Sequence, residues 1–334
     1  MIKQIVDAVR SVIGEATPSN PVHLHVPLFR GNEEKYTADC IAKNQVTHGE
    51  YIERFEAMLC QWTGTKYAVA TCSGTSAYQT LVQCHPKLIE KDEISIPTLN
   101  FVAAANAITM AKKRVRFEDM RPDIEISLLG FNNYSGAIAT DAAQALGSGK
   151  PQSPSVYSFN GNKIITTGGG GAIVTDGEEY AHKLRHFISQ SRIPHQWKVE
   201  HDAISYNYRM PNINAALGCA QLEQLPYILK AKRALANEYM KAFEGIEGVK
   251  VWKEPVAGQS NYWLVSLILD NPKNQEPLLQ ALWDAGYQAR MLPTPLHLLE
   301  SYKDCPHSNL LASVDLWKRV ICLPSSPHLG IKYA

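Results

Sequence analysis

The sequence has no excess of charge of either sign and no hydrophobic run long enough to cross a lipid bilayer. Its 334 residues carry a formal net charge of +1. Because nucleic acids and anionic membrane surfaces attract strongly basic proteins, neither is expected as a partner. A transmembrane segment is not expected either.

The seven cysteines show no pattern that would hold a metal ion or a disulfide framework. Their number is odd, and neither a CxxC pair nor a Cys/His metal spacing occurs among them. We interpret them as reduced thiols of a cytoplasmic protein. Residues 1–14 place their apolar side chains on one face of a helix, which indicates an amphipathic helix and not a signal peptide.

What the chain does have is an alternation of short apolar strands with helical stretches. Strands are predicted at residues 67–70, 94–96, 115–117 and 137–139, a rhythm typical of an α/β fold with a mainly parallel sheet. A long helix is predicted at 213–243, broken or bent near Pro226. Strands at 249–252 and 262–269 and a helix at 276–285 then predict a smaller α+β unit. We expect an N-terminal helix and linker (1–27), a large domain (28–225) and a small C-terminal domain (226–334).

The segment SVYSFNGNKIITTGGGGAIVTD, residues 155–176, encloses one lysine, Lys163, between two apolar runs. Burial lowers the pKa of an amine, and a free amine can form a Schiff base with an aldehyde. The four glycines that follow, 168–171, allow a tight turn or a close backbone approach. A solvated loop lysine is the commoner explanation of such a pattern when nothing else supports it.

The first of three strand-to-helix turns is TCSGTSA, residues 71–77. In an open α/β sheet, ligands bind beyond the carboxyl ends of the strands, where such turns lie. Gly74, Thr75 and Ser76 offer hydroxyl groups and free backbone N–H groups at the start of a helix, which suit a phosphate. An ordinary helix cap explains the same residues, and for the turn in isolation it is the better explanation.

The other two turns contribute an aromatic ring and a carboxylate. Phe101 opens an alanine-rich helix after a strand, where it could stack on a planar ring or simply belong to the core. Asp141 follows an apolar strand, so its carboxylate needs a cationic or N–H partner; helix capping is the alternative. Together with Lys163 and the Gly74 turn, these residues supply what pyridoxal phosphate requires, namely an aldehyde-binding lysine, an acid, a phosphate cradle and a ring surface.

Five motifs occur in the order SGTSA, PTLNFVAAANAI, DAAQALG, YSFNGNKIITTGGGGAIVTD and SYNYRMPNINAALGCAQLEQL. In this combination the chain resembles the DegT/DnrJ family of pyridoxal phosphate-dependent sugar aminotransferases, of fold type I, over roughly residues 24–330. LFRGNEEKY and the forms of the last two motifs look most like the branch that acts on nucleotide-linked 4-keto-6-deoxy amino sugars, as in bacillosamine and legionaminic acid pathways.

The resemblance implies a role for each matching residue. Lys163 would form the Schiff base with the cofactor and carry protons, and Asp141 would pair with the pyridine nitrogen. Further cofactor contacts are implied for Gln144 at the 3-hydroxyl side of the ring, Phe101 on the ring face, Gly74, Thr75, Ser76 and Ser158 at the phosphate, and Asn207 at the phosphate of a neighbouring subunit. His297 and Arg209 are candidate substrate residues, and a structural role is open for both.

The implied reaction moves an amino group from glutamate to a keto carbon of a nucleotide-activated sugar, in a homodimer with shared active sites. Two alternatives are a dehydratase-like activity and a protein that binds the cofactor or the sugar nucleotide without turnover. Because the dehydratase branch generally carries histidine in place of the lysine, Lys163 argues against the first. Its retention with Asp141 argues weakly against the second.

One stretch departs from the family pattern. Only 22 positions separate Asp119 from Asp141, where the family normally carries another strand and a helix, and residues 145–155 also look abbreviated. We therefore expect one βα unit to be reduced or missing. A lost strand would leave a sheet edge that needs cover.

Overall fold

A computed structural model describes residues 1–131, 136–254 and 259–334, and its centre is a five-stranded sheet. The strand order is β1-β7-β6-β5-β4. The strands are β1 Tyr67–Thr71, β4 Ile124–Ile126, β5 Ala139–Asp141, β6 Ser155–Ser158 and β7 Gly171–Thr175. β4, β5 and β6 are parallel, whereas β7 runs antiparallel to both of its neighbours. The predicted α/β class is confirmed, with a sheet of mixed direction.

Two further strands, β2 Glu93–Ile96 and β3 Arg114–Phe117, form a parallel pair beside β4. Asp123, just before β4, accepts hydrogen bonds from the backbone N–H of Ser95 (2.9 Å) and from its hydroxyl (3.0 Å). The outer edge of β3 is covered near its end, since Phe117 donates to the carbonyl of Pro306 and accepts from the N–H of Ser308. The C-terminal part of the chain thus covers this edge, as a sheet margin requires.

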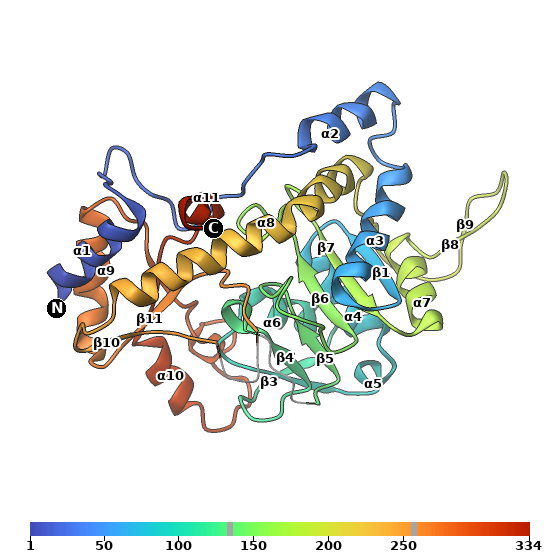
Figure 1. Cartoon of the computed structure of the whole chain (residues 1–334). Helices are drawn as coiled ribbons and strands as arrows, with labels where there is room; N and C mark the ends of the chain where they lie inside the picture. Colours follow the sequence, from blue (N-terminus) through green and yellow to red (C-terminus); the bar gives the residue numbers. More distant parts are fainter. Residues whose placement is uncertain (132–135, 255–258) are drawn as a thin grey trace.

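Helices cover both faces of the sheet (Figure 1). They are α3 Glu50–Thr63, α4 Gly74–Cys84, α6 Val102–Met110, α7 Glu178–Ile188 and α8 Asn212–Ala242. Successive side chains of a strand point to opposite faces. Val69 and Ile173 accordingly join the core under α4, α6 and α7, whereas Ala70 and Ala172 join the core under α3 and α8. The strands are therefore buried on both sides, and their ends are where polar groups can gather.

The shortened connection keeps its strand. β4 was not predicted, yet it fills the place next to β5, so the sheet is not interrupted there. Between β4 and β5, the described residues contain one helical element, the 3₁₀ turn η1 at Leu128–Gly130. The side-chain oxygen of Gln144 accepts a hydrogen bond from the N–H of Leu129 at 2.7 Å, which ties this turn to the segment after β5.

A second, antiparallel sheet has the order β10-β11-β13-β12. Its strands are β10 Val249–Val251, β11 Ser266–Leu269, β12 Arg290–Met291 and β13 Val320–Cys322, and α9 Gln275–Asp284 packs on it. The strand predicted at 262–269 begins only at Ser266. The N-terminal helix α1, Ile2–Ile13, buries Ile5 and Val9 in the same core. We therefore propose that α1 belongs with the small domain, although it begins the chain.

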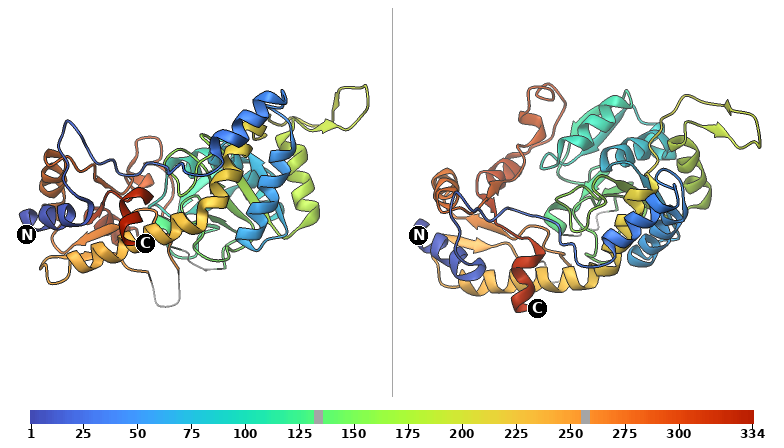
Figure 2. Two further views of the ribbon diagram at one scale, coloured as in Figure 1. Left: turned by 45° about the horizontal axis from the view of Figure 1, so that its top comes forward. Right: turned by 90° about the horizontal axis from the view of Figure 1, so that it is seen from above.

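α8 connects the two sheets and runs for 31 residues (Figure 2). Of the predicted break or bend near Pro226, a break does not occur, because the helix continues through this residue across the expected domain boundary. Proline removes one backbone hydrogen bond, a loss that the packing of α8 against α2 (Glu33–Ala42), α3 and α11 (Pro327–Gly330) can offset.

The remaining α-helices and strands lie at the periphery. They are α5 Pro86–Ile89, α10 Leu311–Trp317, β8 Arg192–Ile193 and β9 Glu200–His201. β8 and β9 form a hairpin that projects from the body of the molecule (Figure 1). Across the described ranges, none of the helices is both long and apolar enough to cross a membrane.

Candidate active site

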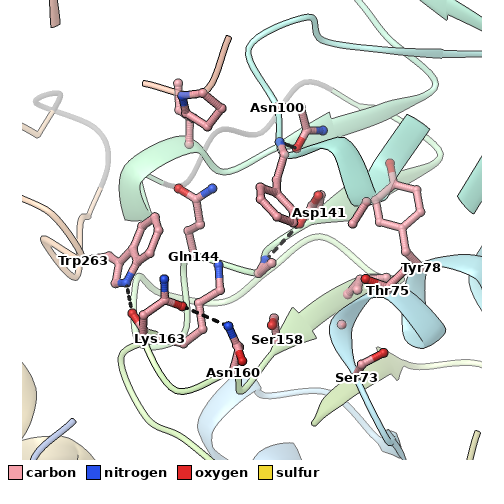
Figure 3. A pocket seen from close by; sticks show the side chains of 18 of the residues that line it. Ser73, Thr75, Tyr78, Asn100, Asp141, Gln144, Ser158, Asn160, Lys163 and Trp263 are labelled. Atoms are coloured by element: carbon pink, nitrogen blue, oxygen red, sulfur yellow. Dashed lines mark hydrogen bonds between the residues drawn. The ribbon is translucent and has the colours of Figure 1, made fainter. Parts of the chain in front are cut away.

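A cavity of about 300 Å³ lies where the strands of the large sheet end, and residues of the small domain close it. The strand ends or the turns after β1, β2, β4, β5 and β6 all contribute lining residues. They include Ser73, Gly74, Thr75, Asn100, Phe101, Leu129, Asp141, Gln144, Ser158 and Lys163, together with Trp263, Arg290, Leu292 and Pro293 from the small domain. Figure 3 shows the side chains of Lys163, Asp141 and Gln144 converging on one space.

Lys163 lies in the loop after β6, where its backbone N–H donates to the carbonyl of Asn160 at 3.0 Å. Its Nζ is 4.4 Å from the ring centroid of Trp263. Burial lowers the pKa of Lys163 to about 8; the charge of Asp141 raises it and that of Arg290 lowers it further. About a tenth of such an amine is unprotonated at pH 7, far more than for an ordinary lysine.

Asp141 is the last residue of β5 and sits between β4 and β6. Sequence reasoning placed it just after a strand at 137–139, whereas β5 has the same length but begins and ends two residues later. One carboxylate oxygen accepts the N–H of Ala143 at 3.1 Å. Burial raises the pKa of Asp141, whereas this hydrogen bond, the charge of Lys163 and the side-chain amide of Asn100 lower it. A buried carboxylate with so few partners requires a cationic or N–H group from a ligand.

The turn after β1 is built as a helix N-terminus. Ser73 caps α4: its hydroxyl accepts the N–H of Ser76 at 3.0 Å, and the hydroxyl of Ser76 accepts the N–H of Ser73 at 3.0 Å. Ser76 is therefore engaged in the cap and does not line the cavity, whereas Ser73, Gly74, Thr75 and, opposite them, Ser158 do. Free N–H groups at the start of α4 with adjacent hydroxyls form a suitable site for a phosphate.

Two glycines permit this turn to approach its neighbours. A Cβ atom on Gly74 would lie 2.7 Å from the Cβ of Ser158, and one on Gly171 would lie 2.4 Å from the carbonyl oxygen of Ser73. Both distances are shorter than van der Waals contact. The start of β7 and the turn before α4 can therefore meet only where one side lacks a side chain.

Replacing Gly171 with alanine should destabilise the protein by about 1–3 kcal/mol, because the added methyl group must displace backbone atoms at Ser73. Urea unfolding measures this change. Gly161→Ala is the matched control in the neighbouring loop, since a Cβ there meets no atom within 4 Å. Equal unfolding free energies for the two variants would contradict the packing described.

Three side-chain polar atoms in the described cavity wall are buried without a hydrogen bond. They are the hydroxyl of Tyr78, the side-chain nitrogen of Asn100 and Nε of Arg290. Such groups are rare in folded proteins and indicate that a ligand or water supplies the partner. Next to Asn100, Phe101 caps α6 and stays 59% exposed at the cavity, so its ring is available for stacking.

Besides Ser76, three predicted site residues lie outside this cavity. Asn207 is exposed near the base of the β8–β9 hairpin, and its side-chain oxygen accepts a hydrogen bond from Nε of Arg209 at 3.1 Å. His297 pairs through Nδ1 with the hydroxyl of Thr98 at 2.7 Å. Within one chain, therefore, the structure does not bring these residues to Lys163.

The lining residues that sequence reasoning missed include Tyr78, Asn100, Trp263 and Arg290. Tyr78 and Asn100 lie in the SGTSAY and PTLN segments, whose position after strands was a usable signal. Trp263 and Arg290 carried no local signal, because they come from the small domain and reach the cavity only through the tertiary fold.

Comparisons with known proteins agree with this geometry. The DegT/DnrJ/EryC1/StrS aminotransferase family matches residues 28–127 and 132–333, and the interruption falls in the shortened β4–β5 connection. The chain is 31% identical to the pyridoxal phosphate-dependent aminotransferase EpsN of Bacillus subtilis, over 92% of each chain. It is 30% identical to GDP-perosamine synthase of Escherichia coli O157:H7, over 92% of this chain and 94% of that protein.

The fold is also that of a solved structure. PseC of Helicobacter pylori, an aminotransferase involved in the biosynthesis of pseudoaminic acid, superimposes with a TM-score of 0.84 at 22% identity. The match covers 94% of this chain and 96% of PseC. The chain thus has the fold of PseC despite the shortened connection.

Proposed function

Because this chain belongs to the DegT/DnrJ/EryC1/StrS aminotransferase family, we propose that it transfers an amino group from glutamate to a keto carbon of a nucleotide-activated sugar. The observation that carries this proposal is the convergence of Lys163 and Asp141 on one cavity, beside the turn at the start of α4 that would hold the phosphate. The relative GDP-perosamine synthase is named for a GDP-linked product, and this name supports a nucleotide sugar as the class of acceptor.

The cofactor is pyridoxal phosphate, and the cavity residues fit it. The buried carboxylate of Asp141 needs an N–H partner, two buried polar atoms of Tyr78 and Asn100 need ligand partners, and the glycine-lined turn leaves room for a phosphate. When bound, the cofactor supplies an aldehyde that takes up the amino group and a ring that withdraws electrons from the reacting carbon.

The residues of the chain would act around that group as follows. Asp141 would hold a positive charge at the ring nitrogen, and Gly74, Thr75 and Ser158 would hold the phosphate. Phe101 would stack on the ring. The side-chain nitrogen of Gln144 would face the 3-hydroxyl side, because its oxygen is engaged by Leu129. Ser76 would act through the cap of α4, by holding Ser73 in place.

Lys163 would first hold the cofactor and then move protons at the reacting carbon. Its Nζ is suited to both tasks because burial lowers its pKa to about 8, which places the free and protonated forms within reach at neutral pH. Trp263 and Phe101 flank the space in which the carbon would react.

Capture of pyridoxal phosphate by the cofactor-free protein should depend on pH through Lys163. Only the free amine condenses, so the rate should rise about tenfold per pH unit below the pKa of about 8 and level off above it. Stopped-flow absorbance between pH 6 and 9.5 measures this profile. A rate that kept rising at the same slope to pH 9.5 would indicate an ordinary lysine pKa instead.

We extend the proposal to a homodimer with shared active sites. The β8–β9 arm and the segment after it carry exposed apolar residues, Trp197 (75%), Val199 (70%) and Ile204 (101%), as an interface would need. Asn207 lies at the base of this arm and would reach the cofactor phosphate of the partner subunit. Asn207 is exposed and lies outside the cavity of its own chain, which supports a contact with the partner's cofactor.

Co-expression of two inactive variants tests the shared site. Hybrids of Lys163→Ala and Asn207→Ala subunits contain one site with both residues intact, so random pairing should restore roughly a quarter of wild-type activity. Separately mixed homodimers that do not exchange subunits are the control. Complete inactivity of isolated hybrids would contradict the sharing of sites.

The acceptor is identified by a panel of nucleotide-linked keto sugars, with the amino product detected by mass spectrometry. Arg209 and His297 remain proposed substrate residues. Arg209 lies near the arm and would act in the partner's site. His297 would act through its contact with Thr98, which lies beside Asn100. If the protein accepts amino groups from glutamate but aminates none of the keto sugars, the sugar assignment is wrong.

We propose a cytoplasmic setting, which the seven free cysteines support.

A further inference from the structure

Trp263 lies where the small domain meets the loop that carries Lys163. It comes from the segment just before β11, and it is only 4% exposed. Its ring centroid is 4.4 Å from Nζ of Lys163, and Figure 3 shows the indole beside this lysine. A side chain of the small domain is thus in direct contact with the amine that would bind the cofactor.

The turn from Asn160 to Lys163 is tied to the rest of the molecule through this indole. Within the turn, the N–H of its last residue donates to the carbonyl of its first at 3.0 Å. From outside, Nε1–H of Trp263 donates to the carbonyl of Asn162 at 2.7 Å. Among the described residues, this is the one hydrogen bond from the turn to another part of the chain. Packing confines the turn little, because a Cβ on Gly161 would meet no atom within 4 Å. The residue just before the lysine is therefore fixed by Trp263.

Trp263 is itself held firmly. Its backbone N–H donates to Oδ1 of Asn261 at 2.8 Å, and its carbonyl accepts a hydrogen bond from Nζ of Lys232 in α8 at 3.0 Å. Asn261 in turn donates to the carbonyls of Gln144 and Leu146, in the segment after β5, at 2.9 Å each. Every polar group of Trp263 is thus engaged, by α8, by the segment after β5 and by the lysine turn. A side chain locked in this way can hold a neighbouring group in one position.

Trp263 and Asn162 also form a wall between the active-site cavity and a second cavity of about 290 Å³, because both residues line both cavities. His23 and Gln288 line the second cavity as well. His23 is exposed, so this cavity reaches the surface. Without the indole, water from that side would reach the amine of Lys163. An aromatic face attracts an ammonium group, but the pKa of Lys163 is lowered, so exclusion of water is the larger effect.

We propose that Trp263 is a positioning residue for Lys163: its indole N–H fixes the turn that carries the lysine, and its ring keeps water away from the amine. This inference rests on the proposed function, in which Lys163 binds the cofactor. Two substitutions separate the two tasks. Trp263→Phe removes the N–H donor and keeps an aromatic ring, whereas Trp263→Leu removes both.

The first measurement is the rate at which the cofactor-free proteins capture pyridoxal phosphate, followed by stopped-flow absorbance across the neutral and alkaline range. In Trp263→Phe the limiting rate at high pH should fall about tenfold, because an unfixed turn must be ordered before the amine can react. The midpoint of the pH profile should stay near the wild-type value. In Trp263→Leu the limiting rate should fall as well, and the midpoint should move to higher pH because water reaches the amine.

Other titratable or charged groups around the amine stay the same in both variants. The charge of Asp141 raises the pKa of Lys163 and that of Arg290 lowers it. His25, which lines the second cavity, remains neutral across this range, because burial and nearby positive charges lower its pKa well below the usual value. Since none of these groups is replaced, a midpoint shift in Trp263→Leu reports the hydration of the amine.

The second measurement is the dissociation constant of pyridoxal phosphate at equilibrium. It should rise about tenfold in Trp263→Phe, which is the cost of ordering the backbone of about one residue on binding, and further in Trp263→Leu. Trp283→Phe is the matched control. The indole N–H of Trp283 also donates to a backbone carbonyl, that of Ala289 at 2.7 Å, but Trp283 lies outside the cavity. This control should match the wild-type protein in both measurements, and urea unfolding verifies that each variant is folded.

Several outcomes would overturn the inference. Variants that lose free energy of unfolding but keep the wild-type midpoint, limiting rate and dissociation constant would show that Trp263 only fills the core. A midpoint that falls in Trp263→Leu would show that the ring favours the ammonium form instead. If Trp263→Leu does not fold, an unchanged limiting rate and dissociation constant in Trp263→Phe still refute the inference. A wild-type protein that captures no pyridoxal phosphate would refute the proposed function itself, and no variant is needed to see that.

Discussion

Replacing Lys163 with alanine should lower turnover by at least about 10³-fold, because acid–base transfer by a positioned side chain contributes about 10²–10⁴-fold and the covalent hold on the cofactor is lost as well. The absorbance band of the lysine-bound cofactor should also vanish. Turnover is measured with glutamate and a keto nucleotide sugar, and the band is read on the same sample.

Folding should not limit the Lys163→Ala protein. Burial already disfavours the protonated amine of Lys163, so removing it from the cofactor-free protein should not reduce the free energy of unfolding. Lys3→Ala, at an exposed position of α1, is the matched lysine control and should keep full activity. A Lys163→Ala protein that folds and turns over at the wild-type rate would refute the role of this lysine.

Asp141→Asn should have the second largest effect, a loss of about 10²–10³-fold in turnover. Two unit charges about 4 Å apart interact by about 4 kcal/mol at an effective dielectric constant of about 20. The neutral amide of asparagine keeps the shape but loses this attraction for a protonated ring nitrogen. The electron-withdrawing form of the ring is then less populated when protons leave the reacting carbon.

Thermal unfolding provides a second measurement on Asp141→Asn. The carboxylate is buried with few partners in the cofactor-free chain, so the substitution should leave that form as stable as before or more stable. The rise in melting temperature that pyridoxal phosphate gives the wild-type protein should shrink in the variant, because binding to the folded state is weaker. An undiminished rise, with unchanged turnover, would contradict the pairing with the ring.

The core of the site could be predicted from the sequence because it follows one rule of α/β sheets. Lys163, Asp141, Phe101 and Gly74 each lie at or after the end of a strand, and strand ends meet at one edge. The structure places all four at the same cavity. Local pattern and a general rule of topology were sufficient here.

The features that the sequence did not predict depend on contacts between distant parts of the chain. Arg290 and Trp263 reach the cavity because α8 fixes the small sheet beside the large one, and no local pattern encodes that placement. β4 is three residues long with a glutamate at its centre, too short to show a period. Ser76 matched a phosphate motif, but its hydroxyl closes the cap of α4. Pro226 signalled a break that the packed helix does not make.

The most direct test of the account is a two-step absorbance experiment on the purified holoenzyme. L-Glutamate, added without an acceptor, should remove the lysine-bound cofactor band and yield one 2-oxoglutarate per active site. A keto nucleotide sugar, added after glutamate is removed, should restore the band and yield one amino sugar nucleotide per site. A cofactor band that persists unchanged in the presence of glutamate, with no 2-oxoglutarate formed, would contradict the account.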